Sequence, residues 1–213
     1  MKVVLALGNP GARYAATRHN IGWMIADAVA GRLGCDFVAG RGDYYAASAR
    51  VGDEDLLIVK PTTYMNNSGV AAAQIVERFG VPVESILAIV DELQFATGRI
   101  QLRPSGSSGG HNGTESLIYH LDSINFPRLR CGIGNEFPSG MMADYVLSPF
   151  PREEHALVEK MIEEGADAVI TWVREGTGRA MNLVNTRRQA ETKNDAAGTG
   201  DGPQAREDGT PGT

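Results

Sequence analysis

Five polar side chains stand where strand-like segments of this sequence give way to turns or helices. They are one imidazole, one carboxylate and three amides: His19, Asp91, Asn9, Asn66 and Asn112. A histidine with a pKa of about 6.5 takes a proton from water at neutral pH, and a carboxylate on one ring nitrogen aims the other at that water. Amides donate to a developing oxyanion without adding charge. This set suits attack of water on an activated acyl group, most easily an ester.

The same segments lack the signatures of cofactor and metal chemistry. Residues 8–11, Gly-Asn-Pro-Gly, do not form the G-x-G-x-x-G dinucleotide fingerprint, and the glycine-rich residues 106–113 are not a Walker loop. The sequence contains no H-E-x-x-H and no closely spaced pair of cysteines that would offer a zinc site. We therefore expect a reaction that uses neither a metal nor a cofactor.

One alternative chemistry uses a serine nucleophile. Residues 106–110 fit G-x-S-x-G with Ser108 at the centre, the strained turn that carries the nucleophile of many serine hydrolases. Asp122 or Asp144, followed by His155, would supply the other two members of a triad. Pro104 interrupts the strand that should lead into the turn, which weighs against this serine esterase.

Hydrophobic periodicity places these residues on alternating strands and helices. Apolar runs predict strands at residues 2–8, 85–90 and 128–133, a hairpin of residues 45–51 and 56–60, and a strand at 98–103. Helical spacing predicts helices over 21–33, 68–79, 112–121, 152–174 and 179–188, with Asn20 as the N-cap of the first. This order predicts an α/β fold, with a mixed, mostly parallel sheet and helices on both faces. Ligands collect beyond the carboxyl ends of such strands, so the five polar side chains should converge on one cleft.

Length and composition bound the organisation of the chain. Its 213 residues, 42% of them hydrophobic, fit one domain, and no apolar run approaches the ~20 residues of a membrane helix. We assign residues 1–188 to a catalytic domain and residues 189–213 to a disordered, acidic, Gly- and Pro-rich tail. Two isolated cysteines and the lack of a leader predict a cytoplasmic protein, and we expect a monomer. The net charge of −6 excludes a strongly basic nucleic-acid coat, but not a local basic patch.

Several motifs, taken in order, resemble the bacterial-type peptidyl-tRNA hydrolase family. They are Gly-Asn-Pro-Gly at 8–11, Tyr-Ala-Ala-Thr-Arg-His-Asn at 14–20, Pro-Thr-Thr-Tyr-Met-Asn-Asn-Ser-Gly at 61–69, Gly-Ser-Ser-Gly-Gly-His-Asn-Gly at 106–113, Phe-Pro-Arg-Leu-Arg-Cys-Gly-Ile-Gly at 126–134 and Asp-Tyr-Val-Leu-Ser-Pro-Phe at 144–150. The resemblance extends from about residue 2 to residue 188. It implies a single α/β domain that needs no metal or cofactor. Its substrate would be peptidyl-tRNA, cleaved at the ester between the peptide and the 3′-terminal ribose, which frees tRNA from aborted translation.

The resemblance also implies a role for each of the five polar side chains. By position, His19 would be the base toward water and Asp91 the residue that orients it. Asn9 and Asn112 would place the substrate and its peptide. Asn66 would hold the water or the tetrahedral oxygen.

The same positional match extends to the surroundings of these residues. Tyr14 and Met65 would line the same cleft. Arg103 and Arg130 would meet the acceptor end of tRNA and its 5′-phosphate, a geometry that suits an arginine fork. His111 lies inside a glycine-rich turn, and we expect it to be structural.

The chain departs from the family pattern in three places. Residues 94–96, Gln-Phe-Ala, replace Asp-Leu-Pro, and Gln101 and residues 141–142, Met-Met, stand where many members are basic. These departures predict few phosphate contacts, modest RNA affinity and a shallow dependence of binding on salt. A non-catalytic RNA-binding relative is a second alternative, but the presence of all five polar side chains favours an enzyme.

Overall fold

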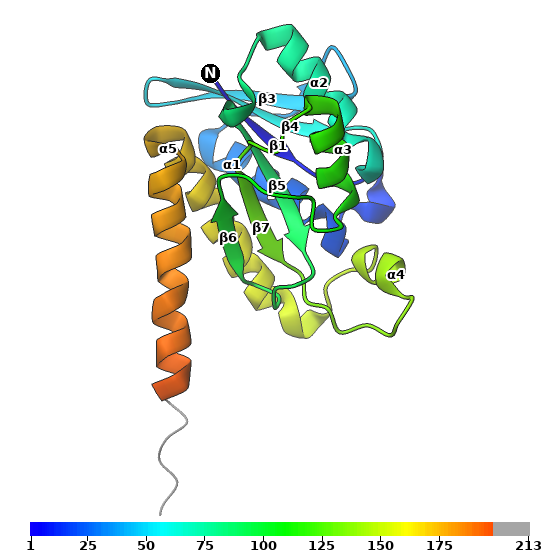
Figure 1. Ribbon diagram of the computed structural model, residues 1–213, viewed down its shortest axis with the longest axis vertical. Helices are drawn as coiled ribbons and strands as arrows, with labels where there is room; N and C mark the ends of the chain where they lie inside the picture. Colours follow the sequence, from blue (N-terminus) through cyan, green and yellow to red (C-terminus); the bar gives the residue numbers. More distant parts are fainter. Residues whose placement is uncertain (198–213) are drawn as a thin grey trace, which may run out of the picture.

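A mixed sheet of seven strands forms the centre of the chain, in the order β2-β3-β4-β1-β5-β7-β6. The computed structural model describes residues 1–197, and the side chains of residues 1–186 (Figure 1). The strands are β1 (Lys2–Ala6), β2 (Val38–Ala39), β3 (Tyr44–Val51), β4 (Glu54–Pro61), β5 (Ile86–Glu92), β6 (Ile100–Arg103) and β7 (Arg128–Gly132). Strands β4, β1, β5 and β7 are parallel, whereas β2, β3 and β6 pair antiparallel. The predicted mixed sheet is confirmed.

Strand β1 lies in the middle of the parallel part and contributes to the cores on both faces. Val4 and Ala6 belong to one hydrophobic core, and Val3 and Leu5 to the other, as the alternation of side chains along a strand requires. Strand β4 pairs with one edge of β1 and β5 with the other. The connections that leave these strands therefore diverge at their carboxyl ends, and such a divergence opens a crevice.

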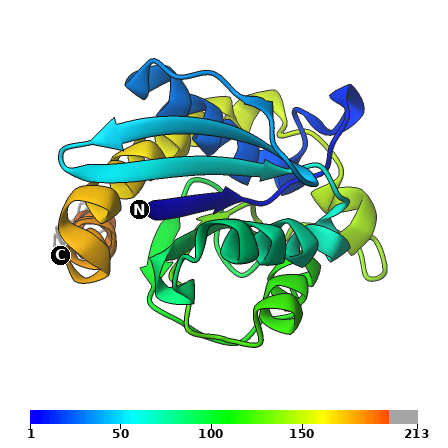
Figure 2. The same cartoon turned by 90° about the horizontal axis from the view of Figure 1, so that it is seen from above.

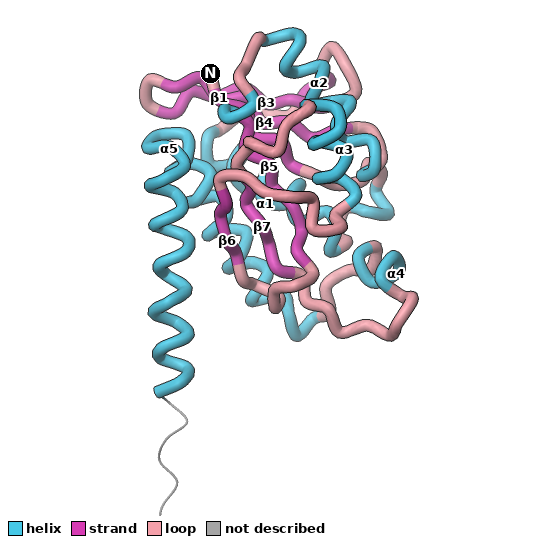
Figure 3. Tube along the Cα trace, in the orientation of Figure 1, coloured by secondary structure: helices cyan, strands magenta, loops and turns pink. Residues whose placement is uncertain are grey.

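Helices cover both faces of the sheet (Figure 2), which confirms the predicted layers. Helices α1 (Ile21–Leu33) and α5 (His155–Ala197) pack over one face, where Trp172 is fully buried. Helices α2 (Ser68–Phe79) and α3 (Asn112–Leu121) pack over the other face and against each other. Helix α4 (Met142–Val146) lies on the loop that leaves β7 (Figure 3). Short 3-10 turns are η1 (Ala12–Tyr14), η2 (Arg18–Asn20), η3 (Met65–Asn67), η4 (Val83–Ser85) and η5 (Arg152–Glu154).

The three predicted helices in the first part of the chain have the bounds of α1, α2 and α3. Two of them end at glycines in the left-handed conformation, Gly34 with φ of 64° and Gly80 with φ of 61°, which is the usual stop for a helix. The hairpin turns at Gly52, with φ of 65°. No helix within residues 1–197 is long and apolar enough to cross a membrane.

The C-terminal helical segment is divided as predicted but extends further. We expected separate helices at 152–174 and 179–188, and α5, from His155 to Ala197, consists of two helical parts that meet at Gly176, whose φ of 83° and ψ of 177° are not helical. A glycine adopts this backbone without steric strain, so it separates the two parts. Helix α5 passes the predicted domain boundary at residue 188, and residues 198–213 of the predicted tail lie outside the described residues.

Candidate active site

A cleft of about 580 Å³ opens at the carboxyl edge of the parallel strands. Asn9 follows β1, Asn66 lies in turn η3 after β4, and Asp91 is the next-to-last residue of β5. His19 in turn η2 and Asn112 at the start of α3 line the same cleft. The sheet thus brings all five polar side chains together around one cavity.

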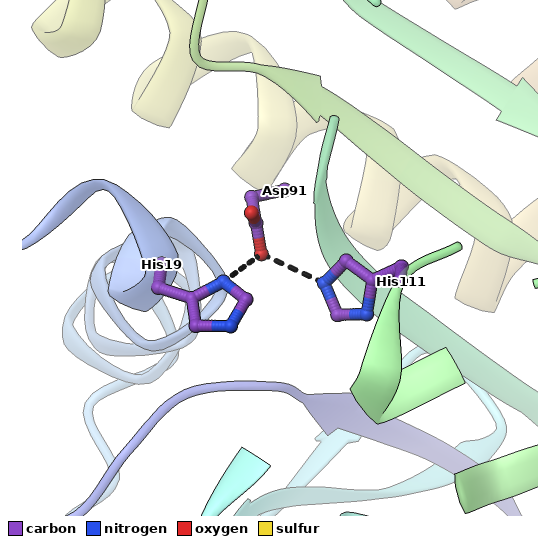
Figure 4. A group of neighbouring side chains, drawn as sticks. All are labelled: His19, Asp91 and His111. Atoms are coloured by element: carbon purple, nitrogen blue, oxygen red, sulfur yellow. Dashed lines mark hydrogen bonds and ion pairs between the residues drawn. The ribbon is translucent and has the colours of Figure 1, made fainter. Parts of the chain in front are cut away.

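Asp91 stands between two imidazole rings (Figure 4). Its Oδ1 lies 2.7 Å from Nδ1 of His19 and 2.8 Å from Nε2 of His111. The Asp91 side chain is only 2% exposed, and the centres of the two rings are 5.3 Å apart. We predicted only His19 at this carboxylate. His111 has a structural role as a helix cap, but it is also a second partner of the same oxygen.

The remaining contacts of the rings define where their protons lie. His111 is the N-cap of α3, and its Nδ1 accepts a hydrogen bond from the backbone N–H of Thr114 at 3.1 Å. The neutral ring therefore carries its proton on Nε2, which donates to Asp91. Because Nδ1 of His19 donates to the same oxygen, Nε2 of His19 keeps a free lone pair at the cleft.

The charges in this cluster keep Asp91 ionised. Burial by itself raises the pKa of Asp91, but the two imidazoles outweigh burial and hold that pKa well below its ordinary value. Burial also lowers the pKa of His111, whereas the Asp91 carboxylate raises it, and the net shift is upward. The carboxylate is therefore a fixed negative charge across the neutral pH range.

The same three side chains have the composition of a metal site, since one ligand atom from each lies within 4.8 Å of the others. A metal bound to Nε2 of His111 would require the proton of that ring on Nδ1. That nitrogen already accepts the N–H of Thr114. The cluster therefore fits hydrogen bonding better than metal coordination.

Asn9 is held by two neighbours. Its backbone N–H donates to Oδ1 of Asn20 at 2.9 Å, and Nδ2 of Asn20 donates back to the Asn9 carbonyl at 2.9 Å. Its own Oδ1 accepts the backbone N–H of Met65, also at 2.9 Å. These bonds leave Nδ2 of Asn9 as a fixed donor. Asn20 occupies the predicted N-cap position of α1, but its fully buried side chain bonds to Asn9 and not to the start of the helix.

Two further amides are exposed in the cleft, while the residues beside them are tightly packed. Asn66 and Asn112 are exposed and line the cavity, and Met65 beside Asn66 is buried. A Cβ on Gly113 would lie 2.5 Å from Sδ of Met65 and 2.8 Å from Cδ1 of Leu7. A larger residue would have to push these side chains aside, so Gly113 lets the start of α3, with Asn112, approach the loop that carries Asn66 closely.

The far wall of the cleft is apolar and tied to the residue next to His19. Met142, Val146 and Leu147, which we call the lip, line the cavity from α4 and the residue after it. The buried guanidinium of Arg18 donates to Oγ of Ser148 at 2.9 Å and to the Pro149 carbonyl. It also lies 4.4 Å from the ring of Tyr145 and 5.1 Å from that of Phe150. Arg18 is a structural residue of the site that sequence reasoning missed.

Comparison with known proteins identifies the family of this chain. A model of the family described as peptidyl-tRNA hydrolase matches residues 3–193. This chain belongs to that family. The peptidyl-tRNA hydrolase of Salinibacter ruber is 42% identical over 183 residues, which are 86% of this chain and 97% of that one. The peptidyl-tRNA hydrolase of Moorella thermoacetica is 43% identical over 184 residues, with the same coverage of 86% and 97%.

A solved structure extends the comparison to three dimensions. The crystal structure of peptidyl-tRNA hydrolase from Acinetobacter baumannii has a TM-score of 0.82 to this chain at 31% identity. The match covers 87% of this chain and 94% of that one. The resemblance identified from the sequence motifs is therefore confirmed, and so is the α/β fold that it implied.

A second pocket of about 370 Å³ in this hydrolase lies beyond Asp91 and is basic. Arg103, Arg128 and Arg130 line it. Burial, with the charge of Arg130 acting in the same direction, lowers the pKa of Arg128 to about 10, which leaves its guanidinium charged at neutral pH. Arg130 forms an ion pair with Glu92, with Nη2 and Oε2 at 2.5 Å. Arg103 and Arg130, predicted from the sequence, thus lie together in a pocket that Asp91 and His111 also line.

Of the remaining predictions, one agrees with the structure and two do not. Met65 lies in the cleft, as expected, but Tyr14 is not among the residues that line it and stacks on Arg13, 4.5 Å from its guanidinium carbon. The serine triad is not assembled. Oγ of Ser108 accepts only the N–H of Gly110, at 3.4 Å, and Nε2 of His155 lies 3.2 Å from the carbonyl oxygen of Phe150. Within the described side chains, no hydrogen bond joins Ser108 to His155 or to either aspartate of that alternative.

Proposed function

We propose that this chain hydrolyses the ester between a peptide and the 3′-terminal ribose of tRNA, with His19 as the general base. One observation carries the assignment of the base. Oδ1 of Asp91 binds Nδ1 of His19 at 2.7 Å, which leaves Nε2 available in a cleft lined by three asparagines. A ring held in this way is oriented to take a proton from water, because its other nitrogen cannot rotate away from the cleft.

The reaction proceeds without a covalent enzyme intermediate. Water loses a proton to Nε2 of His19 as its oxygen bonds to the ester carbonyl carbon. The side-chain N–H groups of Asn9, Asn66 and Asn112 are the available donors to the oxyanion and to the peptide. The carbon–oxygen bond to the ribose then breaks, and the imidazolium returns its proton to the ribose oxygen. The products are a peptide carboxylic acid and tRNA with a free hydroxyl.

The uncharged amides also favour one substrate class. They pair with a peptide N–H and carbonyl, but they offer no compensation for desolvating an α-ammonium group. We therefore propose fast cleavage once the amine is acylated and poor cleavage of free aminoacyl-tRNA. Equal rates on N-acetyl-aminoacyl-tRNA and on the same tRNA with a free amine would contradict this selectivity.

The tRNA side of the substrate fits the second pocket. Its arginines would hold phosphate groups, for which the planar fork of a guanidinium has matching geometry. Met142 is exposed, and its thioether offers no charge to a phosphate. We propose few phosphate contacts and modest affinity for RNA.

We further propose a monomeric enzyme that works in the cytoplasm without a metal. Helices already cover both faces of the sheet, so no bare sheet face requires a partner subunit. Cys35 and Cys131 are free thiols, which fits a reducing compartment. The N–H of Thr114 on His111 opposes metal coordination. Light scattering gives the mass in solution, and activity after chelation tests the need for metal.

The decisive experiment measures release of N-acetyl-amino acid from tRNA by wild type, His19→Ala and Ser108→Ala, without added metal. We expect His19→Ala to lose activity and Ser108→Ala to keep it. Loss with Ser108→Ala alone would support the serine esterase instead. A wild type that binds tRNA but does not turn over would support the non-catalytic RNA-binding relative.

A further inference from the structure

Gln101 touches both arginines of the basic pocket that were assigned from the sequence, but does not line the pocket itself. It lies on edge strand β6, directly opposite Arg130 on β7 and two residues before Arg103. Its Oε1 accepts from Nε of Arg103 at 3.1 Å and from Nη1 of Arg130 at 3.1 Å. Both neighbours are pure donors, so the oxygen of the carboxamide, and not its nitrogen, must face them.

Phe95 supports one of these arginines from another side. Its ring is buried and lies 4.6 Å from the guanidinium carbon of Arg130. A cation held over an aromatic face is attracted to it and loses rotational freedom. Arg130 is therefore fixed by Phe95, by Gln101 and by the carboxylate of Glu92.

The type of acceptor at position 101 decides the charge of the pocket. Two guanidinium groups that converge on one point repel each other unless an acceptor lies between them. A glutamate there would hold them but cancel part of their charge, and an aliphatic residue would let Arg103, which is exposed, move away. A neutral amide oxygen holds both donors and leaves the charge available for an anion. Glu92 already neutralises one of the two, so this distinction matters.

We propose that Gln101, with Phe95, is a positioning residue that fixes Arg103 and Arg130 as one binding face for the phosphates of tRNA. The proposal rests on the proposed function. It reverses the simplest interpretation of position 101, in which the absence of a basic side chain only weakens RNA binding. In this chain the glutamine carries no charge of its own but orients two arginines that do. A guanidinium fork that is already held loses less freedom on binding a phosphate.

The test compares a substrate with phosphates and one without. N-acetyl-aminoacyl-tRNA carries the phosphates, whereas the N-acetyl-aminoacyl ester of adenosine has the same ester and none. For Gln101→Leu we expect KM for the tRNA substrate to rise about fivefold, equivalent to about 1 kcal/mol, with kcat unchanged. The adenosine ester should be hydrolysed at the wild-type rate. For Gln101→Glu we expect a larger rise in KM, and a shallower slope of log KM against log salt, because one cation is neutralised.

A matched control removes an equivalent amide far from the site. Gln74→Leu on α2 loses two hydrogen bonds with Asp43 and should leave both substrates unaffected. An unchanged KM for tRNA in Gln101→Leu would overturn the proposal. So would an equal loss on both substrates, since it would mean a general disturbance of the fold. If wild type hydrolyses neither substrate, the proposed function itself fails, and that outcome is distinct from the others.

Discussion

Two substitutions of His111 distinguish the contribution of its bond to Asp91 from that of its helix cap. In the native protein the ring donates to Asp91 at 2.8 Å and accepts the N–H of Thr114 at 3.1 Å. His111→Ala removes both contacts, whereas His111→Asn keeps a good N-cap but is too short to reach the carboxylate. A hydrogen bond to a charged group contributes about 1.5–3 kcal/mol and a cap about 1 kcal/mol. The free energy of unfolding should therefore fall by about 2.5–4 kcal/mol in the alanine variant and by about 1.5–3 kcal/mol in the asparagine variant.

Both variants should also lose activity. Without the second donor, the bonded oxygen of Asp91 is held only by His19, and the orientation of the base loosens. If all the lost energy serves this orientation, kcat falls about 10- to 100-fold, since each 1.4 kcal/mol changes a rate tenfold. Release of N-acetyl-amino acid from tRNA gives kcat and KM, and circular dichroism during heating gives Tm. His120→Asn is the matched control, because His120 is exposed on the same helix and bonds only to the Ser116 carbonyl.

Two results would refute this reasoning. A wild-type kcat in His111→Asn would mean that the second imidazole does not help to orient Asp91. Equal Tm values for the alanine and asparagine variants would mean that the cap contributes nothing. About 1 kcal/mol should separate them by about 2–4 °C in a domain of this size.

Other perturbations follow from the same geometry. Asn20→Ala leaves the buried N–H and carbonyl of Asn9 unpaired, so the free energy of unfolding in urea should fall by about 2–4 kcal/mol and kcat should fall. An unaltered urea midpoint would argue against a stabilising role for the bonds between Asn20 and Asn9. Gly113→Ala places a methyl group against Met65, which should lower the free energy of unfolding by about 1–3 kcal/mol and raise KM. An unchanged KM would show that the loop carrying Met65 moves without loss of substrate binding. Because the pKa of Asp91 is lowered on folding, its contribution to stability is present above about pH 4 and is lost as pH falls further, so Asp91→Asn should flatten acid unfolding curves.

The sequence predicted the regular elements well where apolar periodicity was long and glycines marked the ends. Helices α1, α2 and α3 have their predicted bounds, because each buries one stripe and two of them stop at a left-handed glycine. The division of α5 between 174 and 179 was also predicted, because Gly176 interrupts the helical backbone there, but its second part extends beyond residue 188 to Ala197. Strand β2, with two residues, and helix α4, with five, are too short for a periodic signal.

The site was predicted in its members but not in its contacts. Asn9 and Asp91 share a cleft because β1 and β5 are adjacent parallel strands whose carboxyl ends lie at the same edge of the sheet. Which side chains reach Asp91 depends on how the loops that carry His19 and His111 fold over the sheet. Spacing along the sequence does not give that distance. His111 was missed for this reason. Asn20 was correctly placed at the N-cap of α1, but its amide bonds to the loop after β1 and not to the helix.

The contacts of Arg18 bear on how a long peptide enters the cleft. Arg18 adjoins His19 in the chain and anchors the segment at Ser148 and Pro149 that supports the lip. An outward movement of that segment would therefore also shift His19 relative to Asp91. We expect the lip to stay in place while a peptide enters the cleft, so that binding of the peptide and orientation of His19 do not oppose each other.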